Sequence, residues 1–516
     1  MSKILAFVLI LALSGCGDLK KVTRENMSPA EFRALPGGKL EKLKKTSPFL
    51  KVHMRNGGTY VLSAWETGAA NQEVTGTGTL YNAARDSVTT GYFRIFPDSV
   101  ALIETNVPRR NGAALALVFF TGITAVVAAI CLSNPKSCFG SCPTFYAFDG
   151  DSLRLQAEGF SSSIAPSLEA TDVDALYHAR ADGRELDIEM RNEAFETHVV
   201  RYANVLAVPR PPGHRAFADL GGHFWDASSL IPPISATGSE GSCLASLAAA
   251  DGIERYSAAD SAYLGAREIV DLEFEGVPDE PVGLVIACRQ TLLSTYLLYQ
   301  TFAYMGRDVG YWLAEIERGR VKQAENPIQR IMGAIEVLTQ DSSGVWRPAA
   351  ELREQGPLAT DTHLIPVAQF DGPSARIRLS MAKGNWRIDY VALAAISGRA
   401  RPMRIQPHMV LKGGARDGSA LAALRDSTKT LVTMPGDTYT LKYRLPANPD
   451  QYELFLESRG YYLEWIRKEW IEEENPALLA QVLLDPEAAL RRMAPEFKRV
   501  EPQMESCFWR SRYAKP

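Results

Sequence analysis

Apolar and polar positions alternate with a period of two across residues 48–108, as in half-buried β-strands. Leu50, Val52 and Met54 fall on one face, and Asn56-Gly57-Gly58 then supplies a hairpin turn. Further strand-like segments follow at 74–80, 88–95 and 99–104. This succession of short strands predicts a small β-barrel or curled sheet over residues 48–108.

Residues 137–265 show a similar pattern, interrupted by two Asp-Gly turns at Asp149-Gly150 and Asp182-Gly183. A strand on each side of such a dipeptide is the signature of a hairpin, so this region is predicted to be an antiparallel β domain. Its strands are expected at 144–148, 153–156, 175–179, 186–190 and 199–208.

Residues 266–445 are predicted to form a β-sandwich-like domain with an inserted helix. The clearest alternation runs from Trp386 to Leu393, and the helix is expected from Gln290 to Met305. The layout of these strands loosely resembles a carbohydrate-binding or discoidin-like jelly roll.

Residues 446–516 change to a helical pattern. Tyr462, Ile466 and Trp470 recur every four residues, which predicts a helix over 453–473 with an aromatic stripe. Two further helices are expected, at 476–484 and at 486–492, the second ending before Pro495. The whole chain is therefore predicted to be mainly β with α additions.

The segment 113–132 contains twenty residues without a charge, long enough to cross a bilayer. A crossing would place Arg109 and Arg110 outside with only Lys136 inside, against the positive-inside tendency. We therefore expect residues 109–136 to form a buried central helix, or a helix lying in the outer leaflet, in preference to a membrane span.

The N-terminus has the three parts of a secretory signal peptide over residues 1–15: a positive Lys3, an apolar stretch and a small-residue cleavage site. Its last residues, Leu13-Ser14-Gly15-Cys16, resemble the lipobox of bacterial lipoproteins. The resemblance implies cleavage before Cys16, a diacylglyceryl group on its sulfur and acylation, for example by palmitate, of the new amine. Such an anchor would place the protein in the cell envelope.

The resemblance also bears on the destination, because Asp at the second position retains such lipoproteins in the inner membrane. Here Gly17 occupies that position, which favours the outer membrane, with the protein facing the periplasm. The polar residues 16–47 are predicted to be a lipidated tether.

Charge and cysteine content narrow the choice of partners. The chain of 516 residues has a net charge of −4 and no long basic run, so nucleic acid is not an expected partner. Six of the seven cysteines follow Cys16, an even number that permits disulfides in an exported protein. The cluster of Cys131, Cys138 and Cys142 is expected to hold at least one bridge.

Catalytic and metal-binding motifs are missing from the sequence: there is no G-x-S-x-G, H-E-x-x-H or Walker loop. The most suggestive polar group is Glu193, Glu196 and His198, in which the last two would share a strand face and bind metal or act as acid and base. A solvated strand face is the preferred interpretation. Asp149, Asp151, Asp172 and Asp174 lack calcium-loop spacing and are assigned to hairpin turns. No catalytic residue, metal site or cofactor is predicted.

Several segments together resemble a group of bacterial envelope proteins to which no activity is assigned. The segments are Ser141-Cys-Pro-Thr-Phe-Tyr, Asn192-Glu-Ala-Phe-Glu-Thr-His198, Asn385-Trp-Arg-Ile-Asp-Tyr-Val-Ala-Leu393 and Leu456-Glu-Ser-Arg-Gly-Tyr-Tyr-Leu-Glu-Trp465. The expected role is non-catalytic binding or scaffolding at the envelope, with a protein or glycan partner. A glycan or peptidoglycan hydrolase using carboxylates, and a subunit of a membrane-associated assembly, remain the alternatives.

Overall fold

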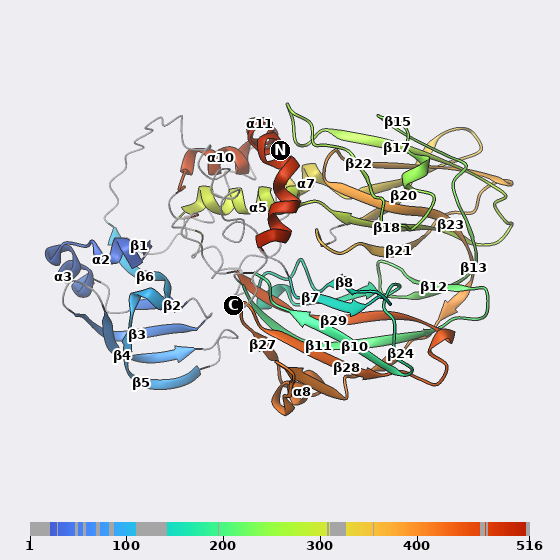
Figure 1. The fold of residues 1–516 in the computed structure, drawn as a ribbon. Coiled ribbons are helices and arrows are strands. Elements are labelled where there is room, and N and C mark those ends of the chain that lie inside the picture. The colour runs from blue at the N-terminus through green and yellow to red at the C-terminus, as the bar shows by residue number, and fades with distance from the viewer. Residues whose placement is uncertain are drawn as a thin grey trace. The chain divides into compact units, whose positions relative to one another are not determined.

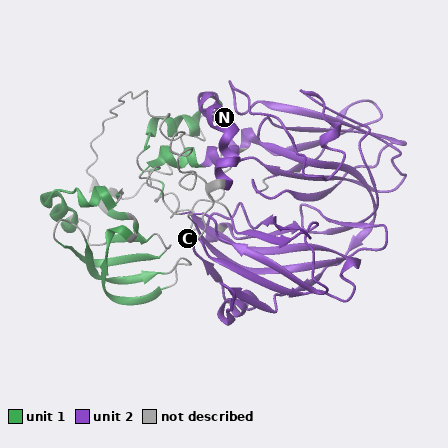
Figure 2. Cartoon of the chain, in the orientation of Figure 1, with its two compact units in different colours: residues 1–127, 299–322, 465–489 green, residues 128–298, 323–464, 490–516 purple. Residues whose placement is uncertain are grey.

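The protein is seen in a computed structural model that divides the chain into two compact units (Figure 2). The first unit comprises residues 1–127, 299–322 and 465–489, and the second comprises residues 128–298, 323–464 and 490–516. The structure describes residues 21–27, 29–46, 50–54, 58–68, 73–81, 87–109, 142–194, 196–306, 309, 327–353, 356–464, 470 and 473–511. The signal peptide, Cys16 and the apolar segment 113–132 lie outside these residues.

The N-terminal part of the first unit is an antiparallel sheet in the order β1-β6-β2-β3-β4-β5 (Figure 1). Its strands are β1 (Lys21–Met27), β2 (Leu50–Met54), β3 (Thr59–Thr67), β4 (Val74–Tyr81), β5 (Ser87–Ile95) and β6 (Val100–Arg109). Two helices, α2 (Pro29–Arg33) and α3 (Gly37–Thr46), connect β1 to β2.

The structure corrects the prediction of a tether for residues 21–46. β1 pairs with β6 along its whole length, and Phe32 of α2 packs against Trp65 of β3, with ring centroids 6.1 Å apart. Leu40 and Leu43, three residues apart on α3, are buried in the same core. A few correctly spaced apolar side chains therefore order a segment that is mostly polar.

Within the second unit, two sheets form a sandwich that we call the first sandwich. One sheet has the order β26-β25-β28-β10-β7-β8, and the other has the order β24-β11-β29-β9 with β27 also paired to β11. The first sheet contains β7 (Thr144–Phe148), β8 (Leu153–Glu158), β10 (Glu185–Arg191), β25 (Met409–Lys412), β26 (Ala415–Arg416) and β28 (Thr438–Arg444). The second contains β9 (Ala170–Ala175), β11 (Glu196–Pro209), β24 (Met403–Ile405), β27 (Leu431–Thr433) and β29 (Tyr452–Glu464).

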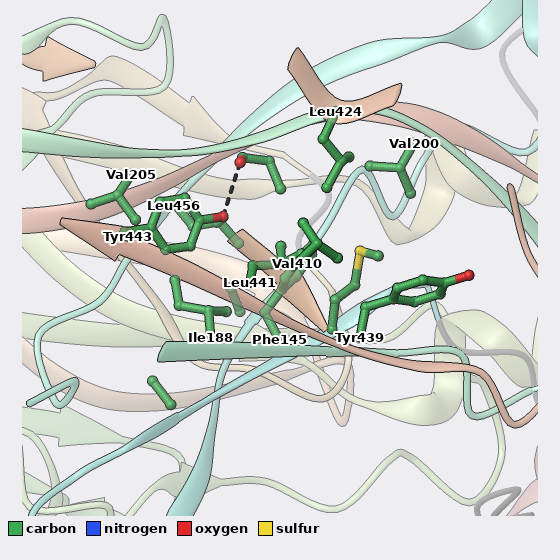
Figure 3. Packing of buried hydrophobic residues seen from close by; sticks show 14 of the residues in the cluster. Phe145, Ile188, Val200, Val205, Val410, Leu424, Tyr439, Leu441, Tyr443 and Leu456 are labelled. Atoms are coloured by element: carbon green, nitrogen blue, oxygen red, sulfur yellow. Dashed lines mark hydrogen bonds between the residues drawn. The ribbon is translucent and has the colours of Figure 1, made fainter. Parts of the chain in front are cut away.

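The core of the first sandwich is formed by inward-facing side chains of both sheets (Figure 3). Phe145 and Tyr443 come from one sheet, and Val205 and Leu456 come from the other. The Tyr443 hydroxyl is buried with its ring and donates a hydrogen bond to the carbonyl oxygen of Ala203 at 2.9 Å. The hydroxyl group is tolerated in the apolar core because it is hydrogen-bonded.

The second sandwich is inserted into the chain of the first, between β11 and β24. One of its sheets has the order β13-β12-β21-β18-β23-β16, with an additional β13–β23 pairing that closes a circuit of strands. The other has the order β15-β14-β17-β22-β19-β20. The strands are β12 (Arg215–Ala218), β13 (Phe224–Ile231), β14 (Ser235–Gly238), β15 (Gly241–Ser242), β16 (Arg255–Tyr256), β17 (Arg267–Glu275), β18 (Val282–Gln290), β19 (Ile335–Gln340), β20 (Trp346–Leu352), β21 (Asp361–Pro366), β22 (Ser374–Ala382) and β23 (Trp386–Ala400).

This topology corrects the predicted domain boundaries. The boundary at 265/266 falls inside the second sandwich, and the strands from β24 to β29 return to the first sandwich. The predicted helix over 453–473 is instead strand β29 as far as Glu464. β29 pairs with β11 on one side and β9 on the other, and both of its faces are covered, so its apolar residues show no period of two.

The described helices that follow β18 along the chain are α5 (Leu292–Met305), α7 (Pro327–Met332), α8 (Gly418–Arg425), α10 (Pro476–Leu484) and α11 (Pro486–Ser511). α5 and α10 confirm the predicted helices at 290–305 and 476–484. α11 continues through Pro495 and Pro502, because Met493, Phe497 and Val500 form a buried stripe that outweighs the lost hydrogen bonds. Within the part of the chain that the structure describes, no helix is long and apolar enough to cross a membrane. The prediction of a mainly β fold with α additions is confirmed.

Candidate functional site

Glu193, Glu196 and His198, the polar group singled out in the sequence, lie in the interior of the first sandwich. Their exposed fractions are 8%, 1% and 0%. β11 begins at Glu196, which pairs with Glu464 of β29, and His198 lies opposite both Tyr462 and Thr433. The prediction of a solvated strand face was wrong, because the side chains of Glu196 and His198 are almost completely buried.

Glu193 is held by the neighbouring strand β7. One of its carboxylate oxygens, Oε2, accepts hydrogen bonds from Thr144 Oγ1 at 2.9 Å and from the Tyr146 hydroxyl at 2.7 Å. The Arg191 guanidinium lies 3.7 Å from its other oxygen and 4.2 Å from the centre of the Tyr146 ring. These contacts join the ends of β7 and β10 and give Glu193 a positioning role in the fold.

Glu196 and His198 do share a strand face, as predicted, and Glu196 Oε2 lies 3.2 Å from His198 Nε2. The start of β11 is fixed by Asn192, whose amide donates to the carbonyl oxygens of Glu196 at 2.9 Å and Thr433 at 3.1 Å. The pair is thus built into the meeting point of β11 and β27.

A second polar group lies where the two sandwiches meet, and we call it the junction cluster. It consists of Glu158 at the end of β8, Asp172 and Asp174 on β9, and Asp361 and His363 on β21. Glu158, Asp174, Asp361 and His363 are between 3% and 7% exposed. Residues about two hundred positions apart therefore form one group of four carboxyls and an imidazole, in which Asp172 is half-buried and the other side chains are buried.

Asp361 links the two sandwiches directly. Its Oδ1 accepts hydrogen bonds from the backbone N–H of Ala175 at 3.0 Å and of Thr362 at 2.8 Å. Its Oδ2 lies 2.9 Å from His363 Nε2. A carboxylate with this many donors is well suited to the charged form.

Glu158, in the first sandwich, makes a second link to the backbone of the second sandwich. Its Oε2 accepts a hydrogen bond from the backbone N–H of Leu358 at 2.9 Å. A Cβ added at Gly356 would lie 2.2 Å from the same oxygen, so only glycine permits this close approach. Within the described residues, Glu158 Oε1 and Asp174 Oδ2 are buried without a hydrogen-bond partner.

Burial and mutual repulsion push the pKa values of the cluster apart. Burial raises the pKa of Glu158 to about 7, and burial together with the charge of Asp361 raises the pKa of Asp172 to about 6. Burial, followed by the charges of Asp172 and Asp361, raises the pKa of Asp174 well above its ordinary range. Although burial opposes ionisation, the charge and hydrogen bond of each partner lower the pKa of Asp361 and raise that of His363.

The junction cluster therefore combines an ion pair, Asp361 with His363, and carboxylic acids that hold protons near neutral pH. Separated pKa values of this kind occur in acid–base catalysis and in structural networks alike. Among the described residues, no group of three or more His, Cys, Asp or Glu side chains has the arrangement of a metal site. The chemistry that the cluster can perform is to retain protons between the two sandwiches.

The aspartates considered for calcium do not lie together. Asp149 Oδ1 accepts from the backbone N–H of Asp151 at 2.9 Å and of Ser152 at 2.8 Å, closing the β7–β8 turn, and these bonds lower the pKa of Asp149. Asp172 and Asp174 belong instead to the junction cluster. Cys142, Cys243 and Cys288 are buried free thiols and Cys507 is buried, whereas Cys131 and Cys138 lie outside the described residues.

Sequence reasoning missed the junction cluster as a unit. A signal was present, since Asp172 and Asp174, and likewise Asp361 and His363, are charged pairs spaced by two within short strands. Such pairs lie on one face of a strand, where burial demands partners.

Comparison with known proteins gives no family. No family model and no curated protein matches the chain. Among solved structures, it is similar to a beta-porphyranase of glycoside hydrolase family 86 from Bacteroides plebeius, with 8% identity, 48% of this chain and 39% of that chain covered, and a TM-score of 0.15. A GH31 alpha-xylosidase from Xanthomonas citri gives 9% identity, coverage of 84% and 38%, and a TM-score of 0.14. The chain spans less than half the length of either protein, and neither likeness bears on fold or activity.

Proposed function

We propose that the chain is a non-catalytic binding or scaffolding protein of the bacterial cell envelope, anchored by lipid on Cys16. The observation that carries the non-catalytic part is the burial of Glu196 and His198, at 1% and 0% exposure. A general acid or base must come within hydrogen-bond reach of its substrate. Side chains fixed between paired strands serve the fold instead.

The lipid anchor is supported by the lipobox-like Leu13-Ser14-Gly15-Cys16. Each acyl CH₂ that enters the membrane contributes about 0.8 kcal/mol, so two or three chains give stable anchoring. Gly17 supports the outer membrane as the destination, and the partner would be an envelope protein or glycan. An anchored protein with two sandwiches offers extended strand and loop surfaces to such a partner.

One test of the anchor compares the wild-type chain with Cys16→Ala during growth with labelled palmitate. We expect label and membrane association for the wild type, and loss of both for Cys16→Ala. Cys243→Ser is the matched control, because it removes a different thiol and should keep the label. Label retained in Cys16→Ala, or a mature protein that still begins with Met1, would overturn the proposal.

The alternative of a glycan or peptidoglycan hydrolase is favoured by one observation, the opposite pKa shifts of Glu158 and Asp361. The purified full chain can be incubated with peptidoglycan sacculi, measuring both sedimentation of the protein with the sacculi and release of soluble fragments. Binding or scaffolding predicts no soluble fragments. Release that Asp361→Asn abolishes, while the variant remains folded by circular dichroism, would establish the hydrolase instead.

A further inference from the structure

Strand β5 is an edge of the first unit's sheet (Figure 1). It pairs with β4 on one side, from Ser87 opposite Tyr81 to Ile95 opposite Val74. On its other side, no strand among the described residues pairs with it. An edge of this kind presents backbone N–H and C=O groups that only another extended chain can satisfy as a ladder.

Other sheet edges of the protein carry features that discourage pairing. β20 contains Pro348, which cannot donate to a ladder, and β15 and β26 are two residues long. Proline, short length and charge are the usual protections of an edge strand.

β5 lacks these protections. Its nine residues, SVTTGYFRI, include no proline and a single charge, Arg94, which is paired with Glu73. Val88 and Tyr92 are 58% and 71% exposed, and Phe96, which continues the same face just after the strand, is 53% exposed. Tyrosine, valine and threonine are the residues that stabilise cross-strand pairs.

We propose that β5 pairs antiparallel with β5 of a second copy of this chain, about a two-fold axis at Gly91. In this register Thr90 lies opposite Tyr92 of the second copy, and Val88 lies opposite Arg94. The strand is thus its own complement, as the isologous interface of a two-fold dimer requires. The proposal is independent of the lipid anchor.

Charge and space at the axis favour this occupant. Six residues separate positions 88 and 94, so the two Arg94 side chains lie about 20 Å apart at opposite ends of the ladder. Gly91 faces Gly91 at the centre, and a Cβ built on it has no heavy atom within 4 Å. A second copy therefore meets neither like charge nor bulk where the strands cross.

Cysteine cross-linking of the full chain in membranes tests the register. Residues directly opposite in an antiparallel pair have Cβ atoms about 5 Å apart, so Gly91→Cys should form a disulfide-linked dimer under mild oxidation, seen on a non-reducing gel. Ser87→Cys is the matched control, because in this register its two copies are eight residues out of step, about 27 Å apart. The thiols at 142, 243, 288 and 507 are buried, and the wild type measures their background.

We expect at least ten times more dimer for Gly91→Cys than for Ser87→Cys. Adding Val88→Lys and Tyr92→Lys to Gly91→Cys should lower the yield at least fivefold, because lysine on an edge opposes pairing. Equal cross-linking of the two cysteine variants, or a yield that the lysines leave unchanged, would overturn the proposal. If Gly91→Cys does not fold, Thr90→Cys replaces it, with a bismaleimide of about 8 Å to span the diagonal pair.

Discussion

Replacing Glu158 by glutamine should remove a large part of the pH dependence of stability. The side chain is 3% exposed, and its pKa rises from an ordinary 4.5 to about 7 in the folded protein. Glutamine keeps the shape and an acceptor for the Leu358 N–H, but it cannot ionise. The groups that face it are Asp172 and Asp174, whose carboxyls discourage ionisation, and Arg289, which favours it.

The magnitude follows from the shift. Between pH 4.5 and 7 the folded protein holds a proton that the unfolded chain has released, so stability falls as the pH rises through this window. A shift of two and a half units corresponds to about 3 kcal/mol, fully lost above pH 7. The raised pKa of His363 adds in the same direction, because that stabilisation is present below its unfolded pKa and is lost as the pH rises through its folded pKa.

The assay is urea unfolding of the full chain in mild detergent at pH 5, 6, 7 and 8, followed by tryptophan fluorescence. Glu158→Gln should match the wild type near pH 5, exceed it by up to about 3 kcal/mol at pH 8 and retain a weaker slope from His363, Asp172 and Asp174, whose pKa values are also raised. Glu351→Gln, an exposed position on β20, is the control and should leave the slope unchanged. The reasoning fails if Glu158→Gln has the wild-type slope, or if it destabilises the protein equally at pH 5 and pH 8.

Three further substitutions test the packing. Arg255→Ala leaves the buried carboxylate of Glu268, which it contacts at 2.7 Å, without its cation, and should cost about 3–5 kcal/mol in urea unfolding, less if Glu268→Gln is added. Gly78→Ala places a Cβ 2.1 Å from the Val61 carbonyl oxygen, so the thermal midpoint of the first unit's sheet should fall, whereas Gly91→Ala, with open space, should be tolerated. Phe145→Ala opens a cavity in the core of the first sandwich and should cost about 3–5 kcal/mol, measured by the same unfolding. An Arg255→Ala protein as stable as wild type would show that the pair is not desolvated.

Local patterns in the sequence were enough to identify many elements. The Asp149-Gly150 turn and its two strands appear as the β7–β8 hairpin, and the alternation after Trp386 appears as β23. These elements are determined by neighbours within a few residues, where turn chemistry and the period of two act directly.

Long-range burial explains what the sequence could not show. The four-residue spacing of Tyr462, Ile466 and Trp470 predicted a helical stripe, but Tyr462 belongs to strand β29, where it and Tyr461 are both buried although they point to opposite faces. The junction cluster depends on Asp361 meeting Ala175, a contact spanning 186 residues. No local pattern encodes which sheets will face each other.

The insertion of the second sandwich has a consequence for biosynthesis. Asn204 of β11 donates a hydrogen bond to Glu457 of β29, 253 residues later in the chain. During synthesis, the first sandwich therefore stays incomplete until the inserted second sandwich and β29 have been made. Contacts between residues so far apart in the sequence form slowly, and the strands that are still unpaired expose apolar surface. Chains terminated early, before β29, would leave β11 open along one side, and we expect them to aggregate or be degraded rather than to persist as shorter working proteins.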